Sequence, residues 1–78
     1  MSERALSNLT YGLVLLQEIN QGYDNSLYRL RAVDYLLQAN LPGLGGALML
    51  WQGHALATST LIDLIENGIK CITQETDS

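Results

Sequence analysis

The chain has 78 residues, of which 47% are hydrophobic and 15% are charged, and its net charge is −4. A chain of this length forms at most one domain and buries only about 62% of its unfolded surface, and the low charge content predicts that a second copy or a partner covers part of the remainder. The acidic balance argues against nucleic-acid binding, and one cysteine with one histidine argues against an internal disulfide and against a Cys/His metal site.

Leucine dominates the sequence. Sixteen residues are Leu, whereas five are Ile and two are Val, so strand-favouring residues are scarce. Alternating steps of three and four residues from Leu6 to Ile72 land almost throughout on apolar side chains, and the polar exceptions are Asn20, Asp34 and Thr58. This period is typical of helices packed along a common seam, and it predicts an all-α protein, a small helical bundle.

The first two helices are predicted at about 3–21 and 25–39. Between them lies a run of poor helix formers in which Gly22 suits the position after a helix end, and Asp24 or Ser26 suits an N-cap. The alternative is a two-helix hairpin whose first arm continues unbroken to residue 39. Either arrangement is expected to be completed by homo-oligomerisation.

The third helix is predicted at about 45–72, after a second break at residues 40–46. Pro42 disfavours helical geometry at Leu41, and three glycines follow. Residues 1–72 are therefore expected to form a single domain, and residues 73–78 a polar, acidic C-terminal tail that frays.

No Asp, Glu, Lys or Arg occurs from Tyr35 to Ile62, a stretch long enough to raise the question of a membrane span. Pro42 and several glycines interrupt this stretch, and no cluster of Lys or Arg flanks it, which argues against a span. The single cysteine and the absence of an N-terminal signal-like segment lead us to expect a protein of the reducing cytoplasm.

The first half of the third predicted helix, residues 46–57, is apolar on essentially every side. Two short helices are too few to cover such a helix, so we expect a self-association surface or a pocket there, extended by the first helix. The residues assigned to this oligomer interface or pocket are Leu13, Leu16, Leu48, Met49, Leu50, Trp51, Gly53, His54, Ala57 and Leu61.

The second predicted helix carries the composition of a binding face. Tyr28, Arg31 and Tyr35 share one side of it, and Tyr and Arg are enriched where binding energy is concentrated. We predict that these three residues contact another protein. The alternative is that Arg31 pairs with Asp34 or Asp24 and the tyrosines only cover the edge of the bundle.

Catalytic chemistry is not indicated. His54 has no nucleophile and acid placed around it, and Cys71 is interpreted as a small hydrophobic residue. We found no phosphate loop or nucleophile elbow in the sequence, and no cofactor is expected.

The function predicted from the sequence is therefore a non-enzymatic protein–protein interaction module, a homodimeric small adaptor, inhibitor or anti-activator of an unidentified protein. The alternative is a small-ligand-binding protein whose apolar cavity is closed by Trp51, His54 and a tyrosine. A membrane-associated small protein is the third possibility.

Overall fold

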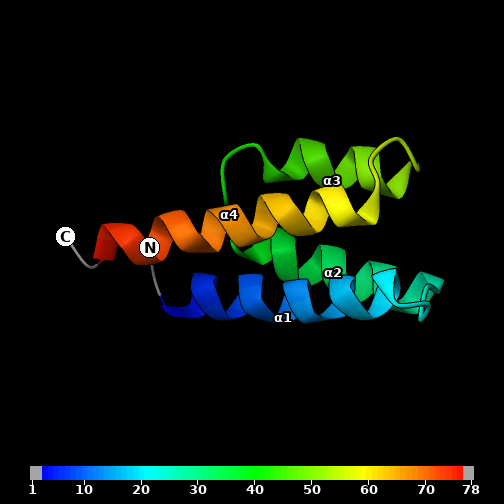
Figure 1. Cartoon of the computed structure of the whole chain (residues 1–78), viewed down its shortest axis with the longest axis horizontal. Coiled ribbons are helices and arrows are strands. Elements are labelled where there is room, and N and C mark those ends of the chain that lie inside the picture. The colour runs from blue at the N-terminus through cyan, green and yellow to red at the C-terminus, as the bar shows by residue number, and fades with distance from the viewer. Residues whose placement is uncertain (1–2, 77–78) are drawn as a thin grey trace.

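The computed structural model describes the backbone of residues 3–76 and the side chains of residues 3–73. Within this range the chain forms four α-helices: α1 at Glu3–Asn20, α2 at Ser26–Gln38, α3 at Leu44–Gln52 and α4 at Thr58–Thr76. Successive helices run in opposite directions, so that the start of α1 and the end of α4 lie at the same end of an elongated body measuring 38 × 19 × 19 Å (Figure 1). The prediction of an all-helical protein is confirmed.

The predicted number of helices is wrong. The helix expected at 45–72 is interrupted at residues 53–57, and its two parts are α3 and α4. A continuous helix of that length would extend about 42 Å, far beyond α1 at about 27 Å, and its apolar end would have nothing to pack against. Folding α3 back along α4 instead buries Leu48 and Trp51 in the protein's own core.

The two-helix hairpin is also contradicted, because the chain turns sharply after α1. Gly22 has a φ of +121°, and the amides of Gly22 and Tyr23 donate to the carbonyls of Ile19 and Glu18. This double hydrogen bond is the Schellman motif that ends many helices, and it needs a residue in the left-handed region. The role predicted for Gly22 is therefore confirmed.

The same device ends α3 without a glycine in the left-handed position. His54 has a φ of +61°, and the amides of His54 and Ala55 donate to the carbonyls of Trp51 and Leu50. At the other end of the bundle, Asn40 adopts a φ of +56° after α2. Each of these residues lies in a short turn after a helix, and these turns let the chain form four antiparallel helices.

The start of α2 corrects one further expectation. Asn25, rather than Asp24 or Ser26, is the N-cap, and its side-chain Oδ1 accepts a hydrogen bond of 2.9 Å from the amide of Tyr28. At the C-terminus, α4 continues through Thr76, so four residues of the predicted tail are helical. Residues 77 and 78 lie outside the described part of the chain.

The core lies between the four helices and is entirely apolar. α1 packs against α2 and α4, and α3 contacts α2 and α4, but α1 and α3 do not touch. The buried residues of this core are Leu9, Leu16, Ile19, Ala32, Leu36, Ala39, Leu44, Leu48, Trp51, Leu61, Ile62 and Ile65. All four helices contribute, so a single copy of the chain already has a common hydrophobic core.

α1 and α2 approach each other closely at Gly12. A Cβ atom on Gly12 would lie 2.5 Å from Cδ2 of Leu36, so only glycine leaves room for that buried side chain. Of the described helices, none has both the length and the apolar character that crossing a membrane requires.

Candidate interaction surface

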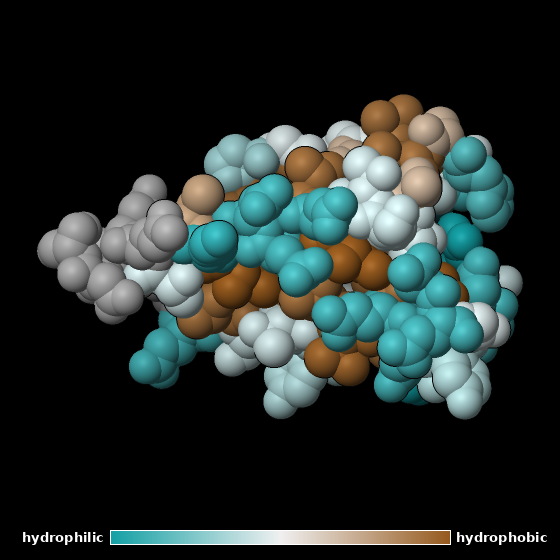
Figure 2. All heavy atoms as spheres, viewed as in Figure 1, coloured by the Kyte–Doolittle hydropathy of each residue, from teal (hydrophilic) through white to brown (hydrophobic). Residues whose placement is uncertain are grey.

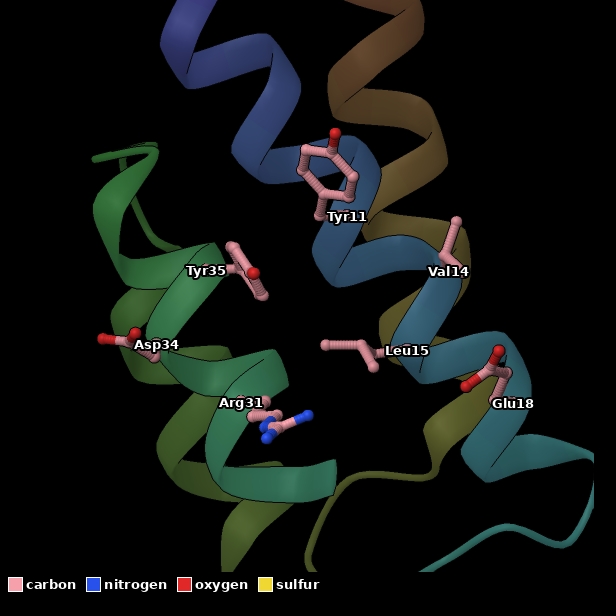
Figure 3. A pocket seen from close by; sticks show the side chains of 7 residues that line it. All are labelled: Tyr11, Val14, Leu15, Glu18, Arg31, Asp34 and Tyr35. Carbon is pink, nitrogen blue, oxygen red and sulfur yellow. The ribbon is translucent and has the colours of Figure 1, made fainter. Parts of the chain in front are cut away.

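A hollow of about 610 Å³ opens on the surface between α1 and α2. We call it the α1–α2 hollow. Figure 3 shows its lining from both helices: Tyr11, Val14, Leu15 and Glu18 come from α1, and Arg31, Asp34 and Tyr35 come from α2.

Two tyrosines, Tyr11 and Tyr35, form one end of this hollow, the upper end in Figure 3. The ring centroids of Tyr11 and Tyr35 are 5.7 Å apart, with an angle of 35° between the planes. Tyr11 is 60% exposed and Tyr35 is 36% exposed, so this pair remains open to a ligand or partner. Exposed aromatic rings with hydroxyl tips offer both apolar contact and hydrogen bonds.

Three charged side chains line the same hollow, and they have both signs. Arg31 projects from α2 toward α1, and Glu18 lies on the α1 side of the gap (Figure 3). The alternative raised by the sequence, an ion pair of Arg31 with Asp34 or Asp24, is not formed among the described residues. Instead, the ion pair among the described residues joins Asp24 to Arg29, with Nε–Oδ1 and Nη2–Oδ2 distances of 2.6 and 2.9 Å.

A stripe of exposed leucines runs along the outer side of α2, beside Asp34. Leu27, Leu30 and Leu37 are each more than half exposed. Steps of three and four residues place them with Asp34, on the side of α2 opposite the buried Ala32. We call the α1–α2 hollow together with these three leucines the α1–α2 face. It combines apolar, aromatic and charged groups that no part of the described chain covers.

The structure brings together two of the three residues predicted to bind a partner. Arg31 and Tyr35 line the α1–α2 hollow, whereas Tyr28 is half-buried and packs against the core. The sequence reasoning missed Tyr11 and Glu18 on α1. Their spacing of seven residues, off the apolar seam, was the available signal, but placing them opposite Arg31 requires knowing how α1 and α2 pair.

The residues predicted to form an oligomer interface or pocket separate into two groups. Leu16, Leu48, Trp51 and Leu61 are buried in the core of the single chain, and Leu13 is half-buried beside them. Their side chains are therefore occupied by the chain's own packing. Met49, Leu50, Gly53, His54 and Ala57 are exposed.

Met49 and Leu50 make the outer side of α3 apolar. Met49 is 73% exposed and Leu50 is 54% exposed, and apolar surface is visible along the edge that α3 forms (Figure 2). A smaller hollow of about 280 Å³ lies nearby, where the start of α3 meets α4, and it is lined by Leu41, Pro42, Gly43, Leu44, Ala47 and Leu64. We call Met49, Leu50 and this hollow the α3 surface.

Trp51 joins three helices at one end of the bundle. The indole is 1% exposed, and its Nε1 donates a hydrogen bond of 3.0 Å to Oγ1 of Thr58 at the start of α4. The guanidinium of Arg29 lies 4.6 Å from the ring centroid, a cation–π contact with α2. The hydrogen bond from Arg29 lowers the pKa of the Asp24 carboxyl, and His54 lowers it further. This cluster is structural, because the ring is closed off from solvent.

The cavity that Trp51, His54 and a tyrosine were predicted to close is not one of the two hollows described above, since neither Trp51 nor His54 lines them. His54, expected inside the helix at 45–72, sits instead in an exposed turn. Cys71 is exposed on α4 rather than packed as a small hydrophobic residue. Among the described residues no group of three or more His, Cys, Asp or Glu side chains is placed to hold a metal ion.

Comparison of the sequence with protein-family models found no match, and comparisons with curated proteins and with solved structures likewise found none.

Proposed function

We propose that this chain is a non-enzymatic protein–protein interaction module, a homodimeric small adaptor, inhibitor or anti-activator that binds another protein in the cytoplasm. The observation that carries this proposal is the α1–α2 hollow. It offers an exposed pair of tyrosines and an arginine without an ion-pair partner in the described chain, and these residue types dominate the energetics of protein interfaces.

The exposed apolar side chains support the same proposal. The chain already has a buried core, yet Tyr11, Leu30 and Met49 are each at least 60% exposed. Exposed apolar patches rimmed by polar groups mark sites that other molecules cover. The α1–α2 face and the α3 surface share no residue, so each can bind its own partner. Two separate surfaces suit an adaptor.

A small-ligand binder is the second candidate, favoured by the volume of the α1–α2 hollow, which falls within the range of about 300–1,000 Å³ for ligand pockets. Such pockets bury most of a ligand, whereas Tyr11 and Tyr35 leave this hollow open. A thermal-shift screen of metabolites and nucleotides discriminates the two. A bound ligand at 100 times its dissociation constant stabilises the fold by about 2.7 kcal/mol.

The test of the proposed function is affinity capture from the native cell, followed by mass spectrometry. We expect the wild-type chain to retain a specific protein, and Arg31→Glu to lose it. Arg4→Glu is the matched control, because it makes the same charge change at an exposed site outside the hollow. Equal recovery of the same proteins by the wild-type chain and Arg31→Glu would show that this face does not bind the partner.

A further inference from the structure

We propose that the α1–α2 face binds a second copy of the same chain, in a two-fold symmetric dimer in which Arg31 of each copy pairs with Glu18 of the other. This inference rests on the proposed function, because it takes the α1–α2 face to be a protein-binding surface and names the protein that occupies it. It also reverses the arrangement expected from the sequence, where self-association was assigned to the first and third helices.

The first argument is charge complementarity. The α1–α2 hollow holds Arg31 together with the acidic Glu18 and Asp34, and none of the three forms an ion pair within residues 3–73. In a two-fold dimer the same patch lies on both sides of the interface, so residue i meets residue j and j meets i. A patch that carries both signs can therefore satisfy itself, whereas the net charge of −4 would repel a copy docked through an acidic patch.

The second argument is the register of the two helices. Tyr11 and Tyr35 lie beside each other where antiparallel α1 and α2 pack, at the register set by Gly12 and Leu36. One turn farther into the hollow, Leu15 and Arg31 point into the gap from opposite helices, and Arg31 is drawn lower than Leu15, about level with Glu18 (Figure 3). A two-fold axis through this gap places α2 of one copy over α1 of the other. Arg31 then lies over the turn of α1 between Leu15 and Glu18, within reach of the carboxylate.

The third argument is size and apolar content. One long side of the molecule measures about 38 by 19 Å, a projected area of about 720 Å², close to the ~800 Å² that each partner contributes to a standard interface. The α1–α2 face lies on two helices that run along the long axis of such a side (Figure 1). Its exposed apolar members are Tyr11, Val14, Leu27, Leu30, Tyr35 and Leu37. These are six of the ten large hydrophobic side chains that are exposed among residues 3–73, and a second copy seated on the hollow would cover the three that line it, Tyr11, Val14 and Tyr35.

The test uses charge reversal and mixing. Arg31→Glu leaves only acids at the proposed contact, and Glu18→Arg leaves Arg31 facing arginine, so each variant alone should repel its own copy. We expect each substitution to raise the dimer dissociation constant by roughly 30-fold or more in sedimentation equilibrium. Mixing the two variants should restore the dimer, because both contacts of the mixed dimer again join an arginine to a glutamate. An ion pair within one chain cannot produce this rescue.

Two substitutions serve as matched controls. Arg4→Glu and Glu66→Arg make the same charge changes at exposed positions outside the α1–α2 face, on α1 and α4. Both should dimerise as the wild-type chain does. Circular dichroism checks that every variant is folded. If a reversal prevents folding, Arg31→Gln and Glu18→Gln replace the pair. Each should weaken the dimer, and mixing them should strengthen it, because one of the two arginine–glutamate contacts is regained.

Three results would overturn the inference. The first is a wild-type chain that sediments as an 8.6 kDa monomer at about 100 µM, a hundredfold above a ~1 µM dissociation constant. The second is a mixture of the two reversed variants that stays monomeric. The third is a dimer that tolerates both reversals but dissociates with Met49→Glu, which would place the interface on the α3 surface. In each case, capture of a partner that Arg31→Glu abolishes would leave the proposed function standing.

Discussion

The hydrogen bond between Trp51 and Thr58 joins the end of α3 to the start of α4. Nε1 of the indole donates to Oγ1 of Thr58 over 3.0 Å, and the residue is 1% exposed. Thr58→Val keeps the size and β-branching of the side chain but removes the acceptor. The indole N–H would then be left without its partner in a place that solvent hardly reaches.

The expected loss of stability follows from that geometry. A buried donor left unsatisfied costs about 1–3 kcal/mol, and we take about 2 kcal/mol. Unfolding entropies of about 2.1 cal/mol/K per residue give roughly 0.16 kcal/mol/K for 78 residues, so the midpoint of thermal unfolding should fall by about 12 °C. Thr58→Ser retains the hydroxyl and should lie within about 0.5 kcal/mol of the wild-type chain.

The assay is unfolding followed by circular dichroism and by tryptophan fluorescence, at one fixed protein concentration. Trp51 is the only tryptophan, so its emission reports this end of the bundle alone. We expect Thr58→Val to unfold earlier by both probes, with Thr58→Ser close to the wild-type chain. Coincident midpoints for Thr58→Val and Thr58→Ser would refute the reasoning, since they would show that the hydrogen bond does not contribute.

Three other substitutions and one pH dependence test the remaining physical claims. Gly12→Ala should lower the thermal unfolding midpoint, because the overpacking against Leu36 costs about 1–3 kcal/mol, more than the gain in helix propensity. Gly46→Ala should raise the midpoint by about 3–6 °C, because its Cβ atom would meet nothing within 4 Å. His54→Gly should stabilise the fold by about 0.5–1 kcal/mol in urea unfolding, because glycine adopts the left-handed conformation without strain. The pKa of Asp24 is lowered in the folded state, mainly by the hydrogen bond from Arg29. The ion pair therefore stabilises the fold at pH values above the ordinary pKa of 3.8, and this stabilisation is lost as the pH falls through the lowered pKa. Urea midpoints of Asp24→Asn measured at neutral and acidic pH should therefore fall less steeply with acid than those of the wild-type chain.

The sequence predicted the first two helices to within one residue at each end because their ends are marked by local signals. Gly22 ends α1 in a left-handed turn, and the segment around Pro42 cannot continue α2. These signals depend on a few neighbouring residues and not on tertiary packing. The ends of α1 and α2 can therefore be recognised from the sequence alone.

The break between α3 and α4 could not be found in the same way. The apolar spacing that suggested one long helix continues through it, since Trp51 and Ile62 are both on the repeat and both face the same core from different helices. The apolar periodicity of the sequence does not reveal a turn that leaves the spacing of apolar residues unchanged. The local signal was also weak, because the left-handed residue is His54 and the glycine precedes it by one position.

For a related reason, the sequence predicted the α2 residues of the candidate site but not its α1 residues. Arg31 and Tyr35 are one helical turn apart on α2, so their common face follows from the sequence. Tyr11 and Glu18 enter the hollow only because α1 lies antiparallel to α2, at a register set by the close approach of Gly12 to Leu36. That register belongs to the packing of two helices and is not encoded in either one.

The two uncovered surfaces differ in how they can discriminate between partners. The α1–α2 face carries Arg31, Glu18 and Asp34, so a wrong partner would bring like charges together, which costs several kcal/mol. α3 contains no charged residue, and its surface can reject a partner only by shape. Specificity by repulsion needs charge. Selective recognition of a second copy among many other proteins therefore favours the α1–α2 face, whereas the exposed Met49 of the α3 surface suits contacts that adapt to differing partner shapes.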